Sequence, residues 1–139
     1  MKRCHSCNET ALNTSRYCLK CWIKDCVRKT LGVKDKQEKE LLANLLLKKL
    51  KLQNHKCAYT GRNITAGINL SLDHVLPKSR FPDSTLNIDN LVWVDLSCNV
   101  AKNNLLPSDF LSMCEAVVLH RSEILCTSQK ILPVQQANI

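Results

Sequence analysis

Four cysteines near the start of the chain have the spacing of metal ligands. Cys4 and Cys7 form one CxxC pair, and Cys18 and Cys21 form a second pair after ten intervening residues. Two such pairs can supply four thiolates to a tetrahedral Zn²⁺ ion, and the metal then contributes folding free energy that so short a polar segment lacks. We therefore expect a structural zinc site in this segment.

Other features of the sequence bear on this zinc assignment. His5 and Cys26 lie near the two pairs and could replace one ligand, although a bystander role is the simpler interpretation. Nine cysteines cannot pair completely within one chain, and no apolar run of a secretion signal follows Met1. We expect a reduced, intracellular (cytoplasmic) protein whose paired cysteines bind metal, with free or disulfide-bonded thiols as the alternative.

A second group of polar residues is spread over apolar segments in the middle of the chain. Its members are Asp73, His74, Asn90, Asn99 and Lys102. An acid beside a histidine within an apolar strand is unusual, because both side chains need polar partners when they are buried. Taken alone, the pair also fits a structural histidine beside a turn carboxylate.

The elements that must position these residues form an α+β pattern. Residues 69–76 and 91–94 predict two short strands, joined by a loop at 77–89 that is rich in Pro, Ser, Asp and Asn. Residues 97–104 predict a helix facing the strands, and residues 107–120 predict another helix that starts at a proline.

A basic amphipathic helix is expected before this core, over residues 33–53. Its leucines recur at spacings of three and four, and Lys48, Lys49 and Lys51 flank them. A leucine stripe of this kind is usually core, so the lysines are the candidates for contact with phosphates.

The order of strand, loop, strand and helix, with these polar residues, resembles the HNH, or ββα-metal, endonuclease family. Three segments carry the likeness: LDHVLPKSR at 72–80, IDNLV at 88–92 and CNVAKNN at 98–104. They are most similar to the HNH domain of CRISPR RNA-guided nucleases, which has these elements in the same order. The resemblance covers about residues 57–118 and implies a small ββα-metal core.

The resemblance implies a role for each matched residue in hydrolysing a phosphodiester bond. His74 would be the general base that takes a proton from the attacking water. Asp73 and Asn99 would hold one Mg²⁺ or Mn²⁺ ion as hard oxygen ligands. Asn90 would hold the loop and orient His74, and Lys102 would contact phosphates.

Two departures from the usual family pattern change the expected metals. Asn99 stands where many relatives have histidine, so the chain resembles the HNN variant, which disfavours a nitrogen-rich zinc or nickel catalytic site. Many relatives also bind zinc in the core through two CxxC pairs, whereas Thr60 and Asp95 here replace one cysteine of each pair. The remaining Cys57 and Cys98 are expected to be buried packing residues.

Basic residues are concentrated in the first part of the chain. Residues 1–56 hold 14 basic and 5 acidic residues, whereas residues 57–139 hold 6 basic and 7 acidic residues. This imbalance indicates a polyanionic partner, DNA first and RNA as an alternative, although a solvated helix face would have the same composition. The candidate nucleic-acid contacts are Lys48, Lys49, Lys51, Lys78 and Arg80.

The sequence supports three hypotheses about function. The first is a DNA endonuclease of phage, homing or restriction type, which nicks one strand or cuts both as a homodimer. The second is an inactive zinc-ribbon adaptor that binds nucleic acid. The third is a scaffold in which the leucine stripe at 41–52 docks a partner helix.

We expect four parts along the chain. These are a zinc-binding module at 1–30, a basic helix at 31–56, a nuclease core with its C-terminal helix at 57–126, and a tail at 127–139 that shows no periodicity. No stretch approaches the roughly 18 apolar residues that cross a membrane, so no membrane partner is expected.

Overall fold

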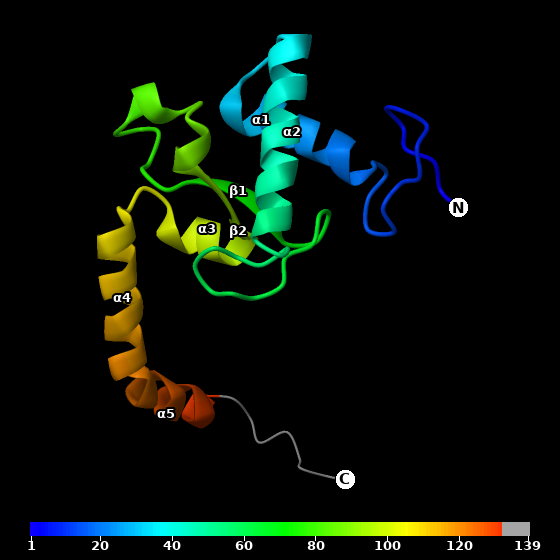
Figure 1. The fold of residues 1–139 in the computed structure, drawn as a ribbon. Helices are drawn as coiled ribbons and strands as arrows, with labels where there is room; N and C mark the ends of the chain where they lie inside the picture. Colours follow the sequence, from blue (N-terminus) through cyan, green and yellow to red (C-terminus); the bar gives the residue numbers. More distant parts are fainter. Residues whose placement is uncertain (132–139) are drawn as a thin grey trace. The chain divides into compact units, whose positions relative to one another are not determined.

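The computed structural model describes residues 1–131 and divides the chain into two compact units, with the division after Asn104 (Figure 1). The first unit holds α1 (Leu19–Leu31), α2 (Lys36–Leu52), β1 (Leu70–His74), β2 (Leu91–Asp95) and α3 (Leu96–Lys102), with short 3₁₀ turns η1 (Pro82–Ser84) and η2 (Ile88–Asn90) between the strands. The second unit holds α4 (Pro107–Leu119) and α5 (Arg121–Ile131). This mixture of helices and a small sheet confirms the α+β expectation.

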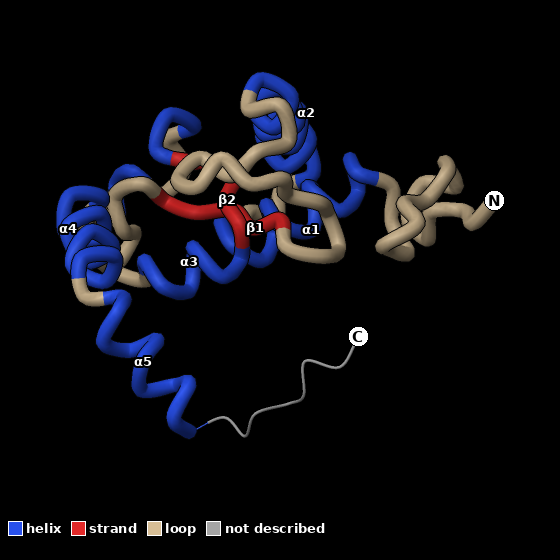
Figure 2. The backbone as a smooth tube through the Cα atoms, turned by 90° about the horizontal axis from the view of Figure 1, so that it is seen from below, coloured by secondary structure: helices blue, strands red, loops and turns tan. Residues whose placement is uncertain are grey.

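The two strands form an antiparallel sheet whose two faces are covered by different helices (Figure 2). Alternate residues of a strand point to opposite faces, so Asp73 and His74 leave β1 in opposite directions. On the His74 face, Trp93 of β2 donates from Nε1 to the backbone oxygen of Leu46 in α2, at 2.8 Å. On the Asp73 face, the helix α3 packs against both strands, as the sequence predicted.

Residues at the two ends of α2 cap the helix and connect it to the middle of β2. Asp35 caps its first turn by accepting a hydrogen bond from the Glu38 nitrogen at 2.8 Å. Just beyond its last turn, the Gln53 amide exchanges two hydrogen bonds with the backbone of Trp93, at 2.8 and 3.0 Å. The expected helix at 33–53 is confirmed, with slightly shorter bounds.

The leucine stripe of α2 is divided between core and surface. Leu42, Leu46 and Leu50 are buried within the first unit, whereas Leu41 and Leu52 are exposed. Because the buried leucines already have partners inside the unit, the stripe is mainly a core face, which argues against the scaffold hypothesis.

The helix α1 was not expected from the sequence, where residues 1–26 were interpreted as a metal-binding segment. Ile23 and Val27 lie one turn apart and are fully buried, and the helix ends at Gly32 in the left-handed conformation, with φ of 73°. The helix packs against α2, and Glu40 of α2 pairs with Lys20 and Lys24 of α1. The zinc-ligand segment is therefore continuous with a helix anchored in the core.

The second unit consists of α4 and α5, which contact each other. Pro107 begins α4, where the missing N–H of proline costs nothing, and α5 continues to Ile131. The expectation of an irregular tail is therefore wrong for residues 127–131, and residues 132–139 lie outside the described part of the chain. Within that part, no helix combines the length and apolar character that crossing a membrane requires.

Candidate metal centre and active site

The four cysteines of the two CxxC pairs meet in space as the spacing predicted. The Sγ atoms of Cys4, Cys7, Cys18 and Cys21 all lie within 4.8 Å of one another, and the Sγ atoms of Cys7 and Cys18 are 3.6 Å apart. A tetrahedral zinc with Zn–S bonds of about 2.3 Å requires sulfurs roughly 3.8 Å apart. Both the thiolate chemistry and the spacing therefore fit a structural Zn²⁺ ion.

The alternative ligands named from the sequence lie outside this cluster. Cys18 is the residue just before α1 and Cys21 lies in its first turn, whereas Cys26 lies farther along the helix. His5 packs edge-on against the ring of Tyr17, with centroids 6.4 Å apart. The geometry therefore favours the four cysteines as the complete ligand set.

The zinc-ligand loop also touches the segment that leads into β1. The Thr14 hydroxyl donates to the backbone oxygen of Ala66 at 2.6 Å. At Gly67, where φ is 78°, an added Cβ would lie 2.4 Å from the backbone oxygen of Thr14. Only glycine permits this approach, three residues before the strand that carries Asp73 and His74.

His74 is held in one orientation by the loop that follows β1. Its Nε2 atom lies 3.0 Å from the backbone oxygen of Thr85. A carbonyl oxygen can only accept, so Nε2 carries the hydrogen and Nδ1 keeps a lone pair. Burial lowers the pKa of His74 and the charge of Lys78 lowers it further, against the opposing effect of the Thr85 hydrogen bond. The imidazole is therefore neutral at pH 7 and can accept a proton at Nδ1.

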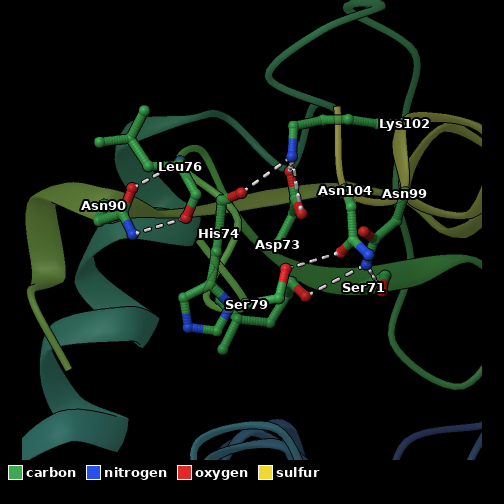
Figure 3. A network of polar contacts seen from close by, with 10 residues as sticks. Ser71, Asp73, His74, Leu76, Ser79, Asn90, Asn99, Lys102 and Asn104 are labelled. Carbon is green, nitrogen blue, oxygen red and sulfur yellow. Dashed lines mark hydrogen bonds and ion pairs between the residues drawn. The ribbon is translucent and has the colours of Figure 1, made fainter. Parts of the chain in front are cut away.

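Asp73 is paired with a lysine inside the core (Figure 3). The residue Lys102 is 0% exposed, and its Nζ atom lies 3.1 Å from Oδ2 and 3.4 Å from Oδ1 of Asp73. Nζ also donates to the backbone oxygen of His74 at 2.9 Å. Burial raises the pKa of Asp73, whereas the Lys102 charge acts to lower it.

The position of Lys102 corrects the role expected from the sequence. We expected it to contact phosphates, but its amine is buried and is used by Asp73 and the His74 backbone. An ammonium group enclosed in this way cannot reach a nucleic acid without leaving both partners. Its place in the structure is to tie α3 to β1.

Asn99 lies on the same face of the sheet as Asp73. Its Nδ2 atom donates to the Ser71 hydroxyl at 2.8 Å and to the backbone oxygen of Leu72 at 3.2 Å, so the amide is oriented through its nitrogen (Figure 3). Asp73 Oδ2 is buried and, despite the nearby ammonium, lacks a well-aligned hydrogen bond. A carboxylate oxygen in this state and an amide oxygen are hard donors, so the donor set fits Mg²⁺ or Mn²⁺.

Asn90 closes the loop between the strands. Its Oδ1 accepts from the Leu76 nitrogen at 2.8 Å, and its Nδ2 donates to the backbone oxygens of Leu76 and Ser84 at 3.1 and 3.2 Å. The expected loop-holding contacts are present, but no direct bond to His74 is found among the described residues. Instead, Asn90 fixes Ser84, and the next residue, Thr85, supplies the carbonyl that orients His74.

Two contributors to this site, Thr85 and Ser71, were not named from the sequence. Thr85 acts through a backbone oxygen, which every residue possesses. Ser71 could have been noticed, because it lies two residues before Asp73 and therefore shares its face of the strand. The hydroxyl of Ser79 also donates to the side chain of Asn104 at 3.3 Å, which joins the ends of the segments 72–80 and 98–104.

The lysines expected on α2 differ in accessibility. Lys48 and Lys51 are exposed. Lys49 is instead half-buried and donates from Nζ to the backbone oxygen of Ile88 at 2.7 Å, and burial lowers the pKa of its amine. Lys49 therefore anchors η2, and the expectation that it faces nucleic acid is not supported by its position.

The two basic residues expected in the loop after β1 are both exposed. Arg80 lies on the surface, and Lys78 donates from Nζ to the backbone oxygen of Thr30 at the end of α1, at 3.4 Å. This contact brings α1 next to the loop that follows His74.

The two cysteines of the core are buried packing residues, as expected. Cys57 and Cys98 are 3% and 8% exposed. Burial acts to raise the pKa of the Cys57 thiol, but hydrogen bonds from Thr60 and from the Asp95 backbone bring it below its usual value. The Asp95 carboxylate caps α3 by accepting from the Ser97 nitrogen at 2.9 Å. Among the described residues, the N-terminal cysteines form the only group of three or more His, Cys, Asp or Glu side chains whose ligand atoms lie close enough together to hold a metal.

Comparison with protein families agrees with this geometry. Residues 57–108 match the family described as HNH endonuclease. The matched segment contains both strands, α3 and all five polar residues of the core, so the resemblance seen in the sequence is confirmed over this segment. The zinc-ligand cysteines, α1 and α2 lie outside the matched segment. A search of the curated proteins finds no match.

Proposed function

We propose that this protein is a metal-dependent DNA endonuclease that hydrolyses phosphodiester bonds with His74 as general base. The observation that carries the proposal is the hydrogen bond from His74 Nε2 to the Thr85 carbonyl, which leaves Nδ1 as the proton acceptor. The lowered pKa of His74 keeps this nitrogen unprotonated at neutral pH.

Asp73 and Asn99 would hold the catalytic cation, Mg²⁺ or Mn²⁺. When bound, such a cation neutralises charge on the scissile phosphate and stabilises the departing oxygen. The chain's own residues prepare this site: the Lys102 charge opposes the effect of burial, which raises the pKa of the Asp73 carboxyl, and the bonds from the Asn99 nitrogen fix the direction of its amide oxygen. His74 then accepts a proton from the attacking water.

Other parts of the chain would bind the DNA substrate and stabilise the fold. Exposed cations at Lys48, Lys51, Lys78 and Arg80 are suited to DNA phosphates. The four N-terminal thiolates would hold structural zinc in a reducing compartment. One such active site cuts one strand, so cleavage of both strands would require a homodimer or two successive nicks.

The experiment is cleavage of supercoiled plasmid in Mg²⁺ or Mn²⁺ by wild type, His74→Ala and His120→Ala. His120 is an exposed histidine of the second unit, so its variant controls for loss of an imidazole elsewhere. We expect nicked or linear DNA from wild type and His120→Ala, none from His74→Ala, and none in the presence of a chelator. Undiminished cleavage by His74→Ala would show that the base is elsewhere or that a contaminant cuts.

One observation favours the second candidate, an inactive nucleic-acid adaptor. The Lys102 ammonium already pairs with the Asp73 carboxylate, so Asp73 has a positively charged partner without a metal. If neither wild type nor variant cuts plasmid or a longer genomic substrate, yet both bind DNA, the adaptor is the better description. The longer substrate is needed because a plasmid can lack a recognition sequence.

A further inference from the structure

A basic hollow of about 480 Å³ lies on the zinc-ligand segment and α1, and its lining residues are outside the segment matched by the HNH family. We call it the N-terminal hollow and define it by four of its lining residues: Lys2, Arg16, Trp22 and Lys29. The loop that contains Thr14 and Ser15 forms another part of its wall. The hollow belongs to the first unit, as does the catalytic core.

The charges in the N-terminal hollow favour an anion. Lys2 and Arg16 are exposed and have no carboxylate partner within residues 1–131. The one lining carboxylate, Asp25, is shared by Lys29 at 2.6 Å and Arg28 at 2.7 Å. The three lining cations, Lys2, Arg16 and Lys29, therefore face one carboxylate that is already paired.

An aromatic wall connects the N-terminal hollow to the catalytic sheet. Trp22 is partly exposed in the hollow, and its ring packs against that of Trp93 in β2, with centroids 6.1 Å apart. A rigid apolar wall beside hydroxyls and cations suits a sugar–phosphate backbone, which presents both apolar and anionic surface.

A hydrogen bond links the end of α1, beside the hollow, to the loop that follows His74. Lys29 lines the hollow, and the backbone oxygen of the next residue, Thr30, accepts from Lys78 at 3.4 Å. Lys78 in turn lies within electrostatic reach of His74. A basic path thus leads from the zinc-ligand segment along the end of α1 to the base.

We propose that the N-terminal hollow binds phosphates of the DNA that flanks the bond attacked at His74. This inference rests on the proposed endonuclease function and adds a substrate-binding surface outside the catalytic domain. Lys2 and Arg16 supply the free charges, and Trp22 supplies the wall against which the backbone lies.

The test compares two double variants that each remove two exposed positive charges from the first unit. Lys2→Gln/Arg16→Gln alters the hollow, whereas Lys56→Gln/Arg62→Gln alters the turn before β1 and is the matched control. Binding of a fluorescent DNA duplex is measured by anisotropy over a series of KCl concentrations, without divalent cation so that nothing is cut. Each phosphate contact contributes about 0.9 to the magnitude of the slope of log K against log salt concentration. The slope of the hollow variant should therefore be smaller in magnitude by about 1.8.

The control variant should keep a slope near that of wild type, and the charge-preserving Lys2→Arg/Arg16→Lys should keep it as well. Equal losses of slope in the hollow and control variants would overturn the inference but leave the endonuclease function standing. Failure of wild type to bind or cut any DNA would overturn both. Zinc content and melting temperature show whether each variant is folded. If the double variant of the hollow does not fold, the single variant Arg16→Gln replaces it, and its salt slope should decrease by about 0.9.

Discussion

Nζ of Lys102 lies 3.1 Å from Oδ2 of Asp73 in the interior of the HNH-like core and at the same time donates to the backbone oxygen of His74. One buried ammonium thus joins α3 to the two adjacent β1 residues on which the proposed chemistry depends. It also supplies the positive charge that a buried carboxylate requires when no metal is bound.

Replacing Lys102 with methionine should strongly destabilise the metal-free protein. The substitution leaves the Asp73 charge buried without its partner, a change that typically costs about 3–5 kcal/mol. The free energy of unfolding, measured in denaturant with a chelator present, reports this loss. Mn²⁺ should then stabilise Lys102→Met more than wild type, because the cation replaces the missing charge.

The double variant Asp73→Asn/Lys102→Met is the matched control for this prediction. It removes both charges, so it should be less destabilised than Lys102→Met and should gain little from Mn²⁺. Stability of Lys102→Met equal to that of wild type would mean that the pair does not hold α3 against β1.

The pH dependence of cleavage should follow the lowered pKa of His74. Because burial and Lys78 depress this pKa, the neutral base persists below pH 6.5, and activity should fall only at more acidic pH. The free energy of unfolding should change with pH in the same direction. Because the unfolded state binds the proton more readily, the contribution of His74 to stability is present above pH 6.5 and is lost as the pH falls through the folded-state pKa.

Lys78→Gln separates the charge effect on His74 from burial. Removing this positive charge should move the acidic limb of the kcat profile upward, toward pH 6.5, while leaving the basic limb in place. Arg80→Gln removes a neighbouring exposed charge and is the control. An unchanged limb in Lys78→Gln would show that Lys78 does not act on the base.

Asn90→Ala should loosen the loop that positions His74. The substitution removes all three side-chain bonds to Leu76 and Ser84, and leaving such groups unsatisfied costs about 1–3 kcal/mol. The rate of cleavage should fall as well, because the Thr85 carbonyl is no longer held. Denaturant unfolding and single-turnover cleavage measure the two effects.

The control for Asn90→Ala is Asn87→Ala. Asn87 is an exposed asparagine in the same loop, and its side chain accepts one hydrogen bond from the described residues, from the Asp89 nitrogen at 3.0 Å. Asn87→Ala should therefore lower the free energy of unfolding and the cleavage rate less than Asn90→Ala does. Similar effects of the two substitutions would argue that Asn90 has no special part in orienting the histidine.

Cys18→Ser should abolish stoichiometric zinc binding, whereas Cys26→Ser should retain one zinc per chain. Cys18 belongs to the four-thiolate cluster and directly precedes α1, but Cys26 lies outside the cluster. Zinc release to a chromophoric chelator measures the stoichiometry. The melting temperature should fall only for Cys18→Ser, because the metal contributes to folding. Zinc retained by Cys18→Ser and lost by Cys26→Ser would reverse the ligand assignment.

The sequence by itself determined the features that depend on local spacing. Two CxxC pairs predicted the thiolate cluster, because a pair of cysteines three residues apart brings two sulfurs to one metal wherever the segment lies. Short apolar segments predicted β1 and β2, and the proline at 107 predicted the start of α4. The Asp73-His74 pair pointed to the site because two titratable residues rarely interrupt an apolar strand.

Only the tertiary structure decided which polar groups face one another. Lys102 and Lys49 are lysines that local sequence places on helices, and lysine on a helix is usually solvated, yet packing against β1 and η2 turns both inward. The carbonyl of Thr85 has no sequence signal at all, since every residue carries one. Local spacing thus predicted which residues can do chemistry, whereas packing between elements distant in sequence sets their partners, burial and charge.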